Sequence, residues 1–439
     1  MWFVVRACAT VKTSVAEYKE SSVKQDTQHR KINTVANSSL PMPLWEFVCL
    51  VAALMAVNAF AVDIMLPAMG VIAEYYQVSG NEQQWLVYSY IIGFGVPQLF
   101  FGPITDRFGR RTLLRICIAA YIVFAFMCMA TTSFFVLCLV RLLQGIFASG
   151  IRVIAVSIVR DLTAGRAMAR VMSLVMTVFM IVPIIAPAIG QGVMMIAGWK
   201  WMFGVLGLAG IFLLIWVHFR LPETLNPDDK QPLNVPKALS GFGQVLKTRV
   251  TLGYMAASGV IYGALFAFIA SAEQIFRDVF HAGDRFALWF AVIAGALGVA
   301  NFINSRVVER YGMRRMSHGI LLTFIVLSLT NYAVLQLGGE KLIYFLPLFA
   351  LTFGCFGMIG ANFSAIAMEP QGKIAGTASA LYGFATTTVA SGFGYLVSSQ
   401  FDGTVSPIVL GFVGLGVISL AVVLVTERGK LFELGEGKG

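Results

Sequence analysis

The chain of 439 residues is 58% hydrophobic and only 12% charged, and its net charge is +10. A soluble domain usually carries about 25% charged residues, so this composition excludes an ordinary soluble protein and indicates one surrounded by lipid. In lipid every backbone polar group must pair within the chain, which leaves helices or closed barrels. The apolar runs are continuous over about 20 residues, as in membrane-crossing helices, and they lack the alternation of barrel strands. We therefore predict an all-α membrane protein.

In chain order, residues 1–42 are mostly polar and are expected to form a disordered cytoplasmic tail. Translation from Met1 and translation from Met42 remain equally open. Two groups of six apolar runs follow, separated by a polar segment at 220–249 that is expected to be a cytoplasmic linker. We predict a bundle of six helices at 43–219, a second at 250–427 and a cytoplasmic tail at 428–439. The predicted spans are 44–72, 83–104, 112–131, 134–159, 168–194 and 199–219, then 250–273, 284–306, 316–336, 342–366, 373–399 and 404–426.

The distribution of Lys and Arg predicts the orientation. With the amino terminus inside, 26 of the 32 basic residues fall on inner segments and span ends, and only four fall on outer ones. Membrane proteins keep such an excess on the cytoplasmic side. The basic charge is therefore explained by topology, and nucleic-acid binding is not expected. Glu46 and Glu273, near the ends of the first and seventh spans, are expected at the membrane interfaces.

The chain repeats one motif. Asp-Arg-Phe-Gly-Arg-Arg at 106–111 follows the second span, and Glu-Arg-Tyr-Gly-Met-Arg-Arg at 309–315 follows the eighth. Internal repeats of this kind are typical of secondary transporters. Glycine permits a tight turn, and the charged side chains can cap helix ends or pair across the two bundles. The expected gating-loop residues are Gly102, Asp106, Arg107, Gly109 and Arg111, with Glu309 and Arg310 in the second copy; a loop that only sets topology is the alternative.

Several motifs resemble those of the major facilitator superfamily. The loop at 102–111 is similar to its loop between spans two and three, and Arg141-Leu-Leu-Gln-Gly145 is similar to a motif in its fourth span. Pro183, Pro187 and Gly190 in span five resemble the motif of its antiporters, and Leu-Pro-Glu-Thr-Leu at 221–225 follows span six as in many members. The sequences at 63–67 and 375–381 resemble the branch of bicyclomycin and chloramphenicol resistance, which are drug/proton antiporters.

This resemblance covers about residues 44–426 and implies two bundles of six helices that expose a central site to each face in turn. It also implies that Pro183, Pro187 and Gly190 form a gating bend. Generic kinking is the alternative, because membrane helices tolerate proline.

Two buried charges stand at similar depths. Asp63 and Arg141 each lie roughly 10–12 Å below the outer face, at 1.5 Å per residue. Ionisable residues inside a bilayer usually face a cavity or a partner. Burial favours a neutral carboxylic acid and a nearby cation favours the carboxylate, so a changing distance between the two residues could load and release a proton. We predict that Asp63 and Arg141 couple protons to transport; a permanent structural ion pair is the alternative.

One face of span four is expected to line the substrate cavity. Arg152 follows Arg141 by eleven residues, or about three helical turns, so both project from one face. An Arg152 that extends its charge toward the inner surface is the alternative. Aromatic side chains could hold lipophilic or cationic compounds. The expected cavity residues are Gln144, Arg152, Tyr88, Tyr262 and Phe266.

The sequence thus predicts a proton-coupled secondary transporter that exports drug-like hydrophobic molecules. An uptake symporter for a small metabolite is the alternative. The sequence shows no nucleophile, nucleotide loop or metal-ligand motif that would support a membrane-embedded enzyme or a receptor. We expect no cofactor and no metal. The expected partners are a small-molecule substrate, protons and the lipid bilayer. We expect a monomer in the cytoplasmic (inner) membrane, with both termini in the cytoplasm.

Overall fold

The computed structural model describes residues 42–163, 165–226, 228 and 235–432, and every regular element in these ranges is a helix. The tail predicted at 1–42 lies outside the described residues except for Met42. The tail predicted at 428–439 is described only as far as Phe432.

The amino-terminal half contains six membrane spans, three of which are interrupted. The first consists of α2 and α3 with a short 3-10 turn between them, the second of α4 and α5, and the fifth of α8 and α9. Its helices are α2 (Leu44–Asp63), η1 (Leu66–Ala68), α3 (Met69–Tyr76), η2 (Gly80–Gln84), α4 (Trp85–Gly95), α5 (Gln98–Phe108), α6 (Arg110–Ala130), α7 (Phe134–Leu162), α8 (Gly165–Phe179), α9 (Val182–Ala197) and α10 (Lys200–Arg220).

Prolines account for two of these interruptions. Helices α4 and α5 meet at an angle of 45°, where Pro97 has no N–H to continue the helical ladder. The second span therefore bends and runs on to Phe108, beyond the predicted end at residue 104. In the fifth span the helix breaks directly before Pro183, which stands in the first turn of α9, a position that proline tolerates well.

The carboxy-terminal half has six spans that are mostly continuous. The linker, predicted as a polar segment, contains the helix α11, which the sequence analysis missed. The elements are α11 (Val235–Lys247), α12 (Arg249–Gln274), the π-helical turn η4 (Ile275–Val279), η5 (Gly283–Arg285), α13 (Phe286–Tyr311), α14 (Met313–Gly338), α15 (Leu342–Met368), η6 (Glu369–Ile374), α16 (Ala375–Ser398) and α17 (Ser406–Thr426).

Within the described residues, ten helices are long and apolar enough to cross a membrane, and the bent pair α4–α5 makes an eleventh span. The twelfth is α16, which has the length but carries many Gly, Ser and Thr residues. It packs against α12 in its own half and against α4 and α5 in the other, so it faces protein more than lipid. The all-α architecture of twelve spans in two bundles is confirmed.

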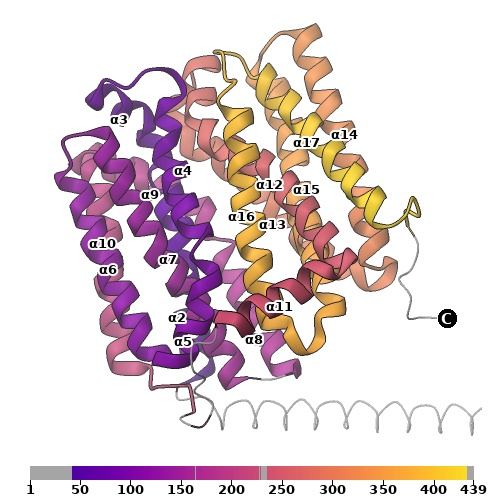
Figure 1. Ribbon diagram of the computed structural model, residues 1–439. Helices are drawn as coiled ribbons and strands as arrows, with labels where there is room; N and C mark the ends of the chain where they lie inside the picture. The colour runs from indigo at the N-terminus through magenta and orange to yellow at the C-terminus, as the bar shows by residue number, and fades with distance from the viewer. Residues whose placement is uncertain (1–41, 164, 227, 229–234, 433–439) are drawn as a thin grey trace, which may run out of the picture.

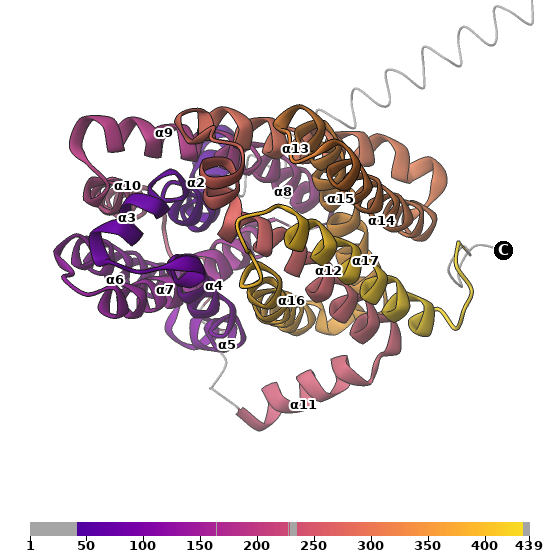
Figure 2. The same cartoon turned by 90° about the horizontal axis from the view of Figure 1, so that it is seen from above.

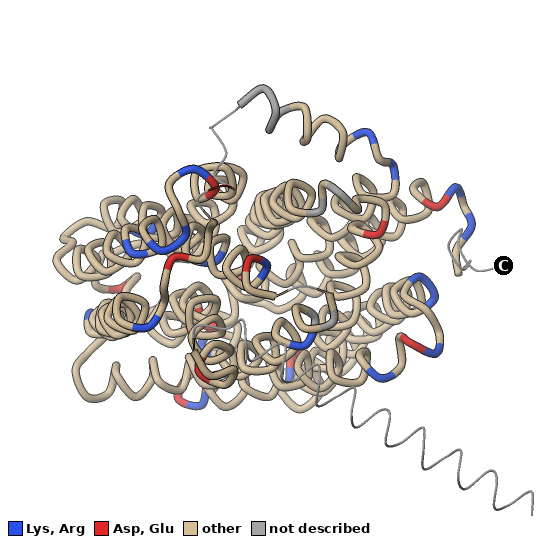
Figure 3. The backbone as a smooth tube through the Cα atoms, turned by 90° about the horizontal axis from the view of Figure 1, so that it is seen from below, with Lys and Arg blue, Asp and Glu red and all other residues tan. Residues whose placement is uncertain are grey.

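The two halves stand side by side (Figure 1), and α12 and α16 lie where they meet (Figure 2). Helix α11 lies outside the bundles near the lower end in Figure 1, and its Phe242 and Val245 contact the α12–α16 pair. We call the end with α3 the outer face and the end with α11 the inner face, following the predicted orientation. Figure 3 views the inner face and shows Lys and Arg at its helix ends and loops.

Candidate functional site

Asp63 is the last residue of α2, directly before the turn that interrupts the first span. Its side chain is only 5% exposed, and it forms no hydrogen bond or ion pair with any described residue. An unpaired carboxylate in an apolar interior is costly as an anion and far less costly as a neutral acid. The position therefore suits a group that binds and releases a proton.

The span-five motif packs directly against this turn. A side chain on Gly190 of α9 would collide with the backbone carbonyl oxygen of Ile64, the residue after Asp63. Only glycine allows this approach, because it has no Cβ. The fifth span breaks before α9, and Pro187 inside α9 has no N–H to donate, so the backbone hydrogen bonds of the span are interrupted twice before this contact. A movement of α9 would thus reach Asp63 without an intermediate.

Arg141 is fully buried, and it forms no ion pair with Asp63 in the conformation described. This contradicts the alternative of a permanent ion pair, and the predicted coupling stays a prediction. Its Nη2 donates to the carbonyl oxygen of Ala61 at 3.0 Å, and its Nη1 donates to Gln144 Oε1 at 2.8 Å. A weaker bond joins its Nε to the carbonyl oxygen of Leu86 at 3.5 Å, and its guanidinium lies 4.3 Å from the ring centre of Tyr90. Because α2 ends so close by, backbone carbonyls satisfy the cation.

Two of the expected cavity residues lie within the packing. Gln144 is fully buried as the acceptor for Arg141, and Tyr88 is fully buried with its hydroxyl 2.9 Å from Ser398 Oγ of the other half. In this conformation neither lines a cavity. The backbone oxygen of Phe266 also lies near the Tyr88 hydroxyl, at 3.5 Å.

Arg152 and Tyr262 are neighbours that come from opposite halves. Arg152 is residue 19 of the 29 in the long helix α7, and its guanidinium lies 5.6 Å from the ring centre of Phe94. Tyr262, from α12 of the other half, is close enough to interact with it electrostatically. Both side chains remain partly exposed. The structure thus brings together two of the predicted cavity residues, one from each half.

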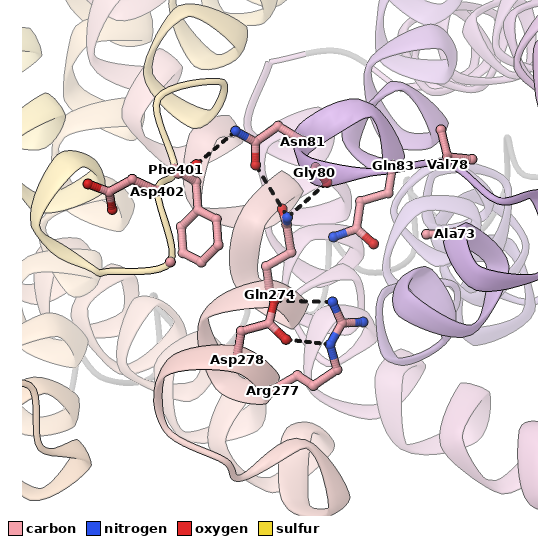
Figure 4. Close-up of a pocket in the computed structure, with 11 residues that line it drawn as sticks. Ala73, Val78, Gly80, Asn81, Gln83, Gln274, Arg277, Asp278, Phe401 and Asp402 are labelled. Carbon is pink, nitrogen blue, oxygen red and sulfur yellow. Dashed lines mark hydrogen bonds and ion pairs between the residues drawn. The ribbon is translucent and has the colours of Figure 1, made fainter.

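Amide side chains join the two halves at the outer face. Asn81 donates to the carbonyl oxygens of Ser399 and Phe401, both at 2.9 Å, and Gln84 donates to Gln274 Oε1 at 2.9 Å. A cavity of about 290 Å³ lies beside these contacts, as Figure 4 shows. These cross-half bonds close this part of the outer face.

The two glutamates expected at membrane interfaces stand at the ends of their spans, and both are buried within the protein. Glu273 is 7% exposed and pairs with Arg277 at 2.7 Å. Glu46 is also 7% exposed and pairs with Arg220 at 2.6 Å. A nearby arginine offsets the cost of burying each carboxylate, a pairing that could not be assigned from the sequence.

The inner loop after α5 is held by partners within its own half. Gly109 turns the chain with a φ of 92°, a value that favours glycine. Arg110 pairs with Asp106 at 2.5 Å and with Asp161 of α7 at 2.8 Å. Glu223, from the Leu-Pro-Glu-Thr-Leu motif, accepts the backbone N–H groups of Arg110 at 2.8 Å and Arg111 at 3.2 Å. It caps the start of α6, where an anion is favoured.

No ion pair of this loop crosses between the halves among the described residues, so the predicted cross-bundle pairing is absent in this conformation. Arg107 is exposed and lies over its neighbour Phe108, and Gly102 borders open space. The sequence analysis missed Arg110, Asp161 and Glu223 as members of the network.

The second copy of the motif builds a related network from different residues. Arg314 pairs with Glu369, after α15, at 3.2 Å and with Glu427, after α17, at 3.1 Å. Glu309 and Arg310, which the sequence singled out, are exposed and form no ion pair with a described residue. The acidic partners again come from the ends of the fourth and sixth spans of the half, which is the only signal that could have found them.

The sequence and the structure are similar to those of known transporters. The family description "Major Facilitator Superfamily" matches residues 51–395. A bicyclomycin resistance protein homolog of Haemophilus influenzae is 30% identical over 87% of this chain and 96% of its own length. A chloramphenicol resistance protein of Pseudomonas aeruginosa is 27% identical, over 84% of this chain and 88% of its own.

Among solved structures, the crystal structure of a D-xylose-proton symporter is similar with a TM-score of 0.72 at 13% identity, over 89% of this chain and 99% of the other. A bacterial homolog of the human lysosomal transporter Spinster, in an inward-facing and unoccupied conformation, gives a TM-score of 0.67 at 12% identity, over 88% and 96% of the two chains. These likenesses concern the fold alone. The chain belongs to the major facilitator superfamily, on its bicyclomycin/chloramphenicol-resistance branch, and is a membrane transport protein rather than an enzyme.

Proposed function

We propose that this protein exports drug-like hydrophobic molecules from the cell in exchange for protons. The observation that carries the proposal is the Asp63 carboxyl group, buried at the end of α2 without a partner among the described residues. Such a group is stable as a neutral acid while it is enclosed and loses its proton when water and counter-charges reach it. A conformational change that opens it to one face at a time would couple proton movement to transport.

The span-five motif supports a link between the movement of α9 and the proposed proton carrier. Gly190 of α9 contacts the chain at Ile64, next to the proposed proton carrier. When α9 moves, the surroundings of Asp63 change with it. The names of the relatives, which refer to resistance to bicyclomycin and chloramphenicol, favour export over uptake. We propose that the protein acts as a monomer in the inner membrane, with both termini in the cytoplasm.

Transport in everted membrane vesicles tests the proposal. Vesicles with an acidic interior should accumulate labelled chloramphenicol or bicyclomycin when they contain the protein, and addition of either compound should release protons from the interior. Vesicles without the protein provide the control. If the vesicles instead expel a preloaded compound together with protons, the protein is an uptake symporter. If a panel of such drugs causes neither accumulation nor proton release, the proposed export is wrong.

A further inference from the structure

We propose that Arg152 selects the charge of the substrate: it pairs with a carboxylate or another anionic group of the transported molecule, so the protein prefers organic anions. The inference rests on the proposed transport site between the two halves and specifies its substrate class. It is carried by the contrast between Arg152 and the other buried charges of the spans.

The position of Arg152 removes the simplest alternative, which is contact with water at a membrane surface. Arg152 precedes the inner end of α7 at Leu162 by ten residues, or roughly 15 Å along the helix. This distance exceeds the length of an arginine side chain. The guanidinium therefore cannot extend to the inner end of α7 by snorkelling.

Arg152 also lacks the partners that the other interior charges have. Arg141 donates to two backbone carbonyls and one amide, while the buried carboxylates of Glu46 and Glu273 each pair with an arginine at a helix end. Arg152 has no carboxylate partner and no hydrogen-bond acceptor among the described residues; the Phe94 ring lies against it, and Tyr262 is close enough to interact with it electrostatically. An unpaired charge inside a membrane protein is costly and usually faces a ligand pathway.

No acid of the spans is placed to fill this role. Asp63 lies at the depth of Arg141, which is eleven residues, or roughly 16 Å, from Arg152 along α7. Glu46 and Glu273 are already paired with their own arginines. The anion that neutralises Arg152 must therefore come from outside the described chain.

The surroundings of Arg152 offer further groups for a bound molecule. Tyr262 presents its ring from the opposite half and stacks on Phe356 with the ring centres 6.4 Å apart. Thr388 of α16 lies beside Gly95, the residue after Phe94, and its buried Oγ1 has no hydrogen-bond partner among the described residues. An unsatisfied polar atom, together with a cation and aromatic rings, suits an aromatic or amphiphilic molecule with one anionic group.

If the substrate is an anion, the membrane potential contributes to the force that drives its export. Export of a monoanion moves one more unit of negative charge outward than export of its neutral analogue at the same proton count. The inside-negative potential of a cell therefore drives the anion more strongly. Collapse of the potential with valinomycin and potassium should slow transport of the anion more than transport of the neutral analogue.

Pairs of ligands that differ only in a carboxylate and its neutral analogue test directly whether Arg152 selects anions. We would measure equilibrium binding to the purified full chain in nanodiscs at pH 7.5, using 2-naphthoate with 2-naphthamide, nalidixate with its amide, and fusidate with its methyl ester. At least one carboxylate should bind fivefold or more tightly than its neutral partner. Arg152→Gln should abolish this preference without weakening the neutral ligand, whereas Arg152→Lys should retain part of it. The matched control is Arg160→Gln, on the exposed inner end of the same helix, which should leave the preference unchanged.

Thermal unfolding without ligand separates selection from a structural role. Because Arg152→Gln removes an unpaired charge, its melting temperature should equal or exceed that of the wild type. A lower melting temperature with the anion preference intact would overturn the proposal, as would the absence of a fivefold preference in every pair. These measurements use no proton gradient, so the proposal can fail while proton-coupled export of neutral drugs stands. Conversely, anion binding through Arg152 without gradient-driven transport would overturn only the proposed function.

Discussion

The fourth span of each half has the same place in the fold but a different interior. In the amino-terminal half, α7 carries two arginines away from its ends: Arg141 binds backbone carbonyls, and Arg152 has no ion-pair or hydrogen-bond partner among the described residues. In the carboxy-terminal half, α15 carries aromatic rings instead. Phe345 and Phe349 stack with their ring centres 4.6 Å apart, and Phe268 of α12 lies 4.6 Å from Phe349.

This difference indicates that the two halves have different roles, one in coupling and the other in stability. Lipid provides no hydrophobic force between helices, so membrane bundles depend on close packing, and interlocked aromatic rings provide much of it. The carboxy-terminal half is therefore expected to behave as a stiff body. The amino-terminal half contains the charges whose protonation or pairing can change during a cycle. Substitutions in the first half should alter coupling, and substitutions in the second should alter stability.

The largest effect is expected from Asp63→Asn. Asparagine has the size of aspartate but cannot carry a proton, so gradient-driven accumulation in everted vesicles should fall by more than about 100-fold, or 2.7 kcal/mol. Folding should be preserved, because Asp63 has no partner to lose. Glu74→Gln, at an exposed position on α3, is the control. If the Asp63→Asn protein still releases protons when substrate is added, Asp63 has a structural role, and the assignment of coupling to the amino-terminal half loses its main support.

Arg141→Ala should affect stability and coupling together. The change leaves the Ala61 carbonyl and the Gln144 amide unsatisfied inside the bundle, so we expect a loss of about 4 kcal/mol, measured by unfolding in detergent. The milder Arg141→Lys keeps the charge and permits a transport measurement. If Asp63 meets this cation in another conformation, weakening the contact should let Asp63 hold its proton to higher pH, and the transport profile should move toward higher pH. An unchanged profile would show that the two residues never pair.

Phe349→Ala tests the other half. Removing a fully buried ring leaves a cavity among its aromatic neighbours, and the expected cost is about 3 kcal/mol in unfolding free energy. Transport per folded molecule, and its pH profile, should remain as in the wild type. Phe349→Leu, which fills most of the space, should cost clearly less. A shift in the pH profile of Phe349→Ala would show that the aromatic half takes part in coupling.

The architecture could be predicted from the sequence because long apolar runs indicate membrane helices, and the placement of Lys and Arg indicates their orientation. The bend at Pro97 and the linker helix α11 were not predicted, since one falls inside a continuous apolar run and the other inside a polar segment. The hydrogen-bond partners of the site residues were harder to predict than these helices. Arg141 binds backbone carbonyls, which every residue carries, and Glu223 caps a helix 112 or more residues away in the chain. These contacts depend on how α2, α4, α6, α7 and α10 pack together.

The smallest effects are expected at the inner loops, where the halves again differ. In the amino-terminal loop, Asp106 is 38% exposed and pairs with Arg110 on the adjoining helix. In the carboxy-terminal half, Glu427 is 15% exposed, pairs with Arg314 and also accepts a hydrogen bond from Tyr254 at 2.8 Å. The more buried acid with two donors should matter more, because burial reduces solvent screening.

Asp106→Asn should therefore cost only about 0.5 kcal/mol of stability, and Glu427→Gln about 1–2 kcal/mol. Both Asp106 and Arg110 belong to one half and move with it, so their pair should not favour one transport state over the other. Cysteine probes at the inner ends of α7 and α15, and at the outer ends of α2 and α12, should then label at wild-type rates in Asp106→Asn. Faster labelling inside together with slower labelling outside would mean that Asp106 finds a partner across the halves when the inner face closes. In that case the loop would join the two halves when the inner face is closed, and its contacts within one half would belong only to the present conformation.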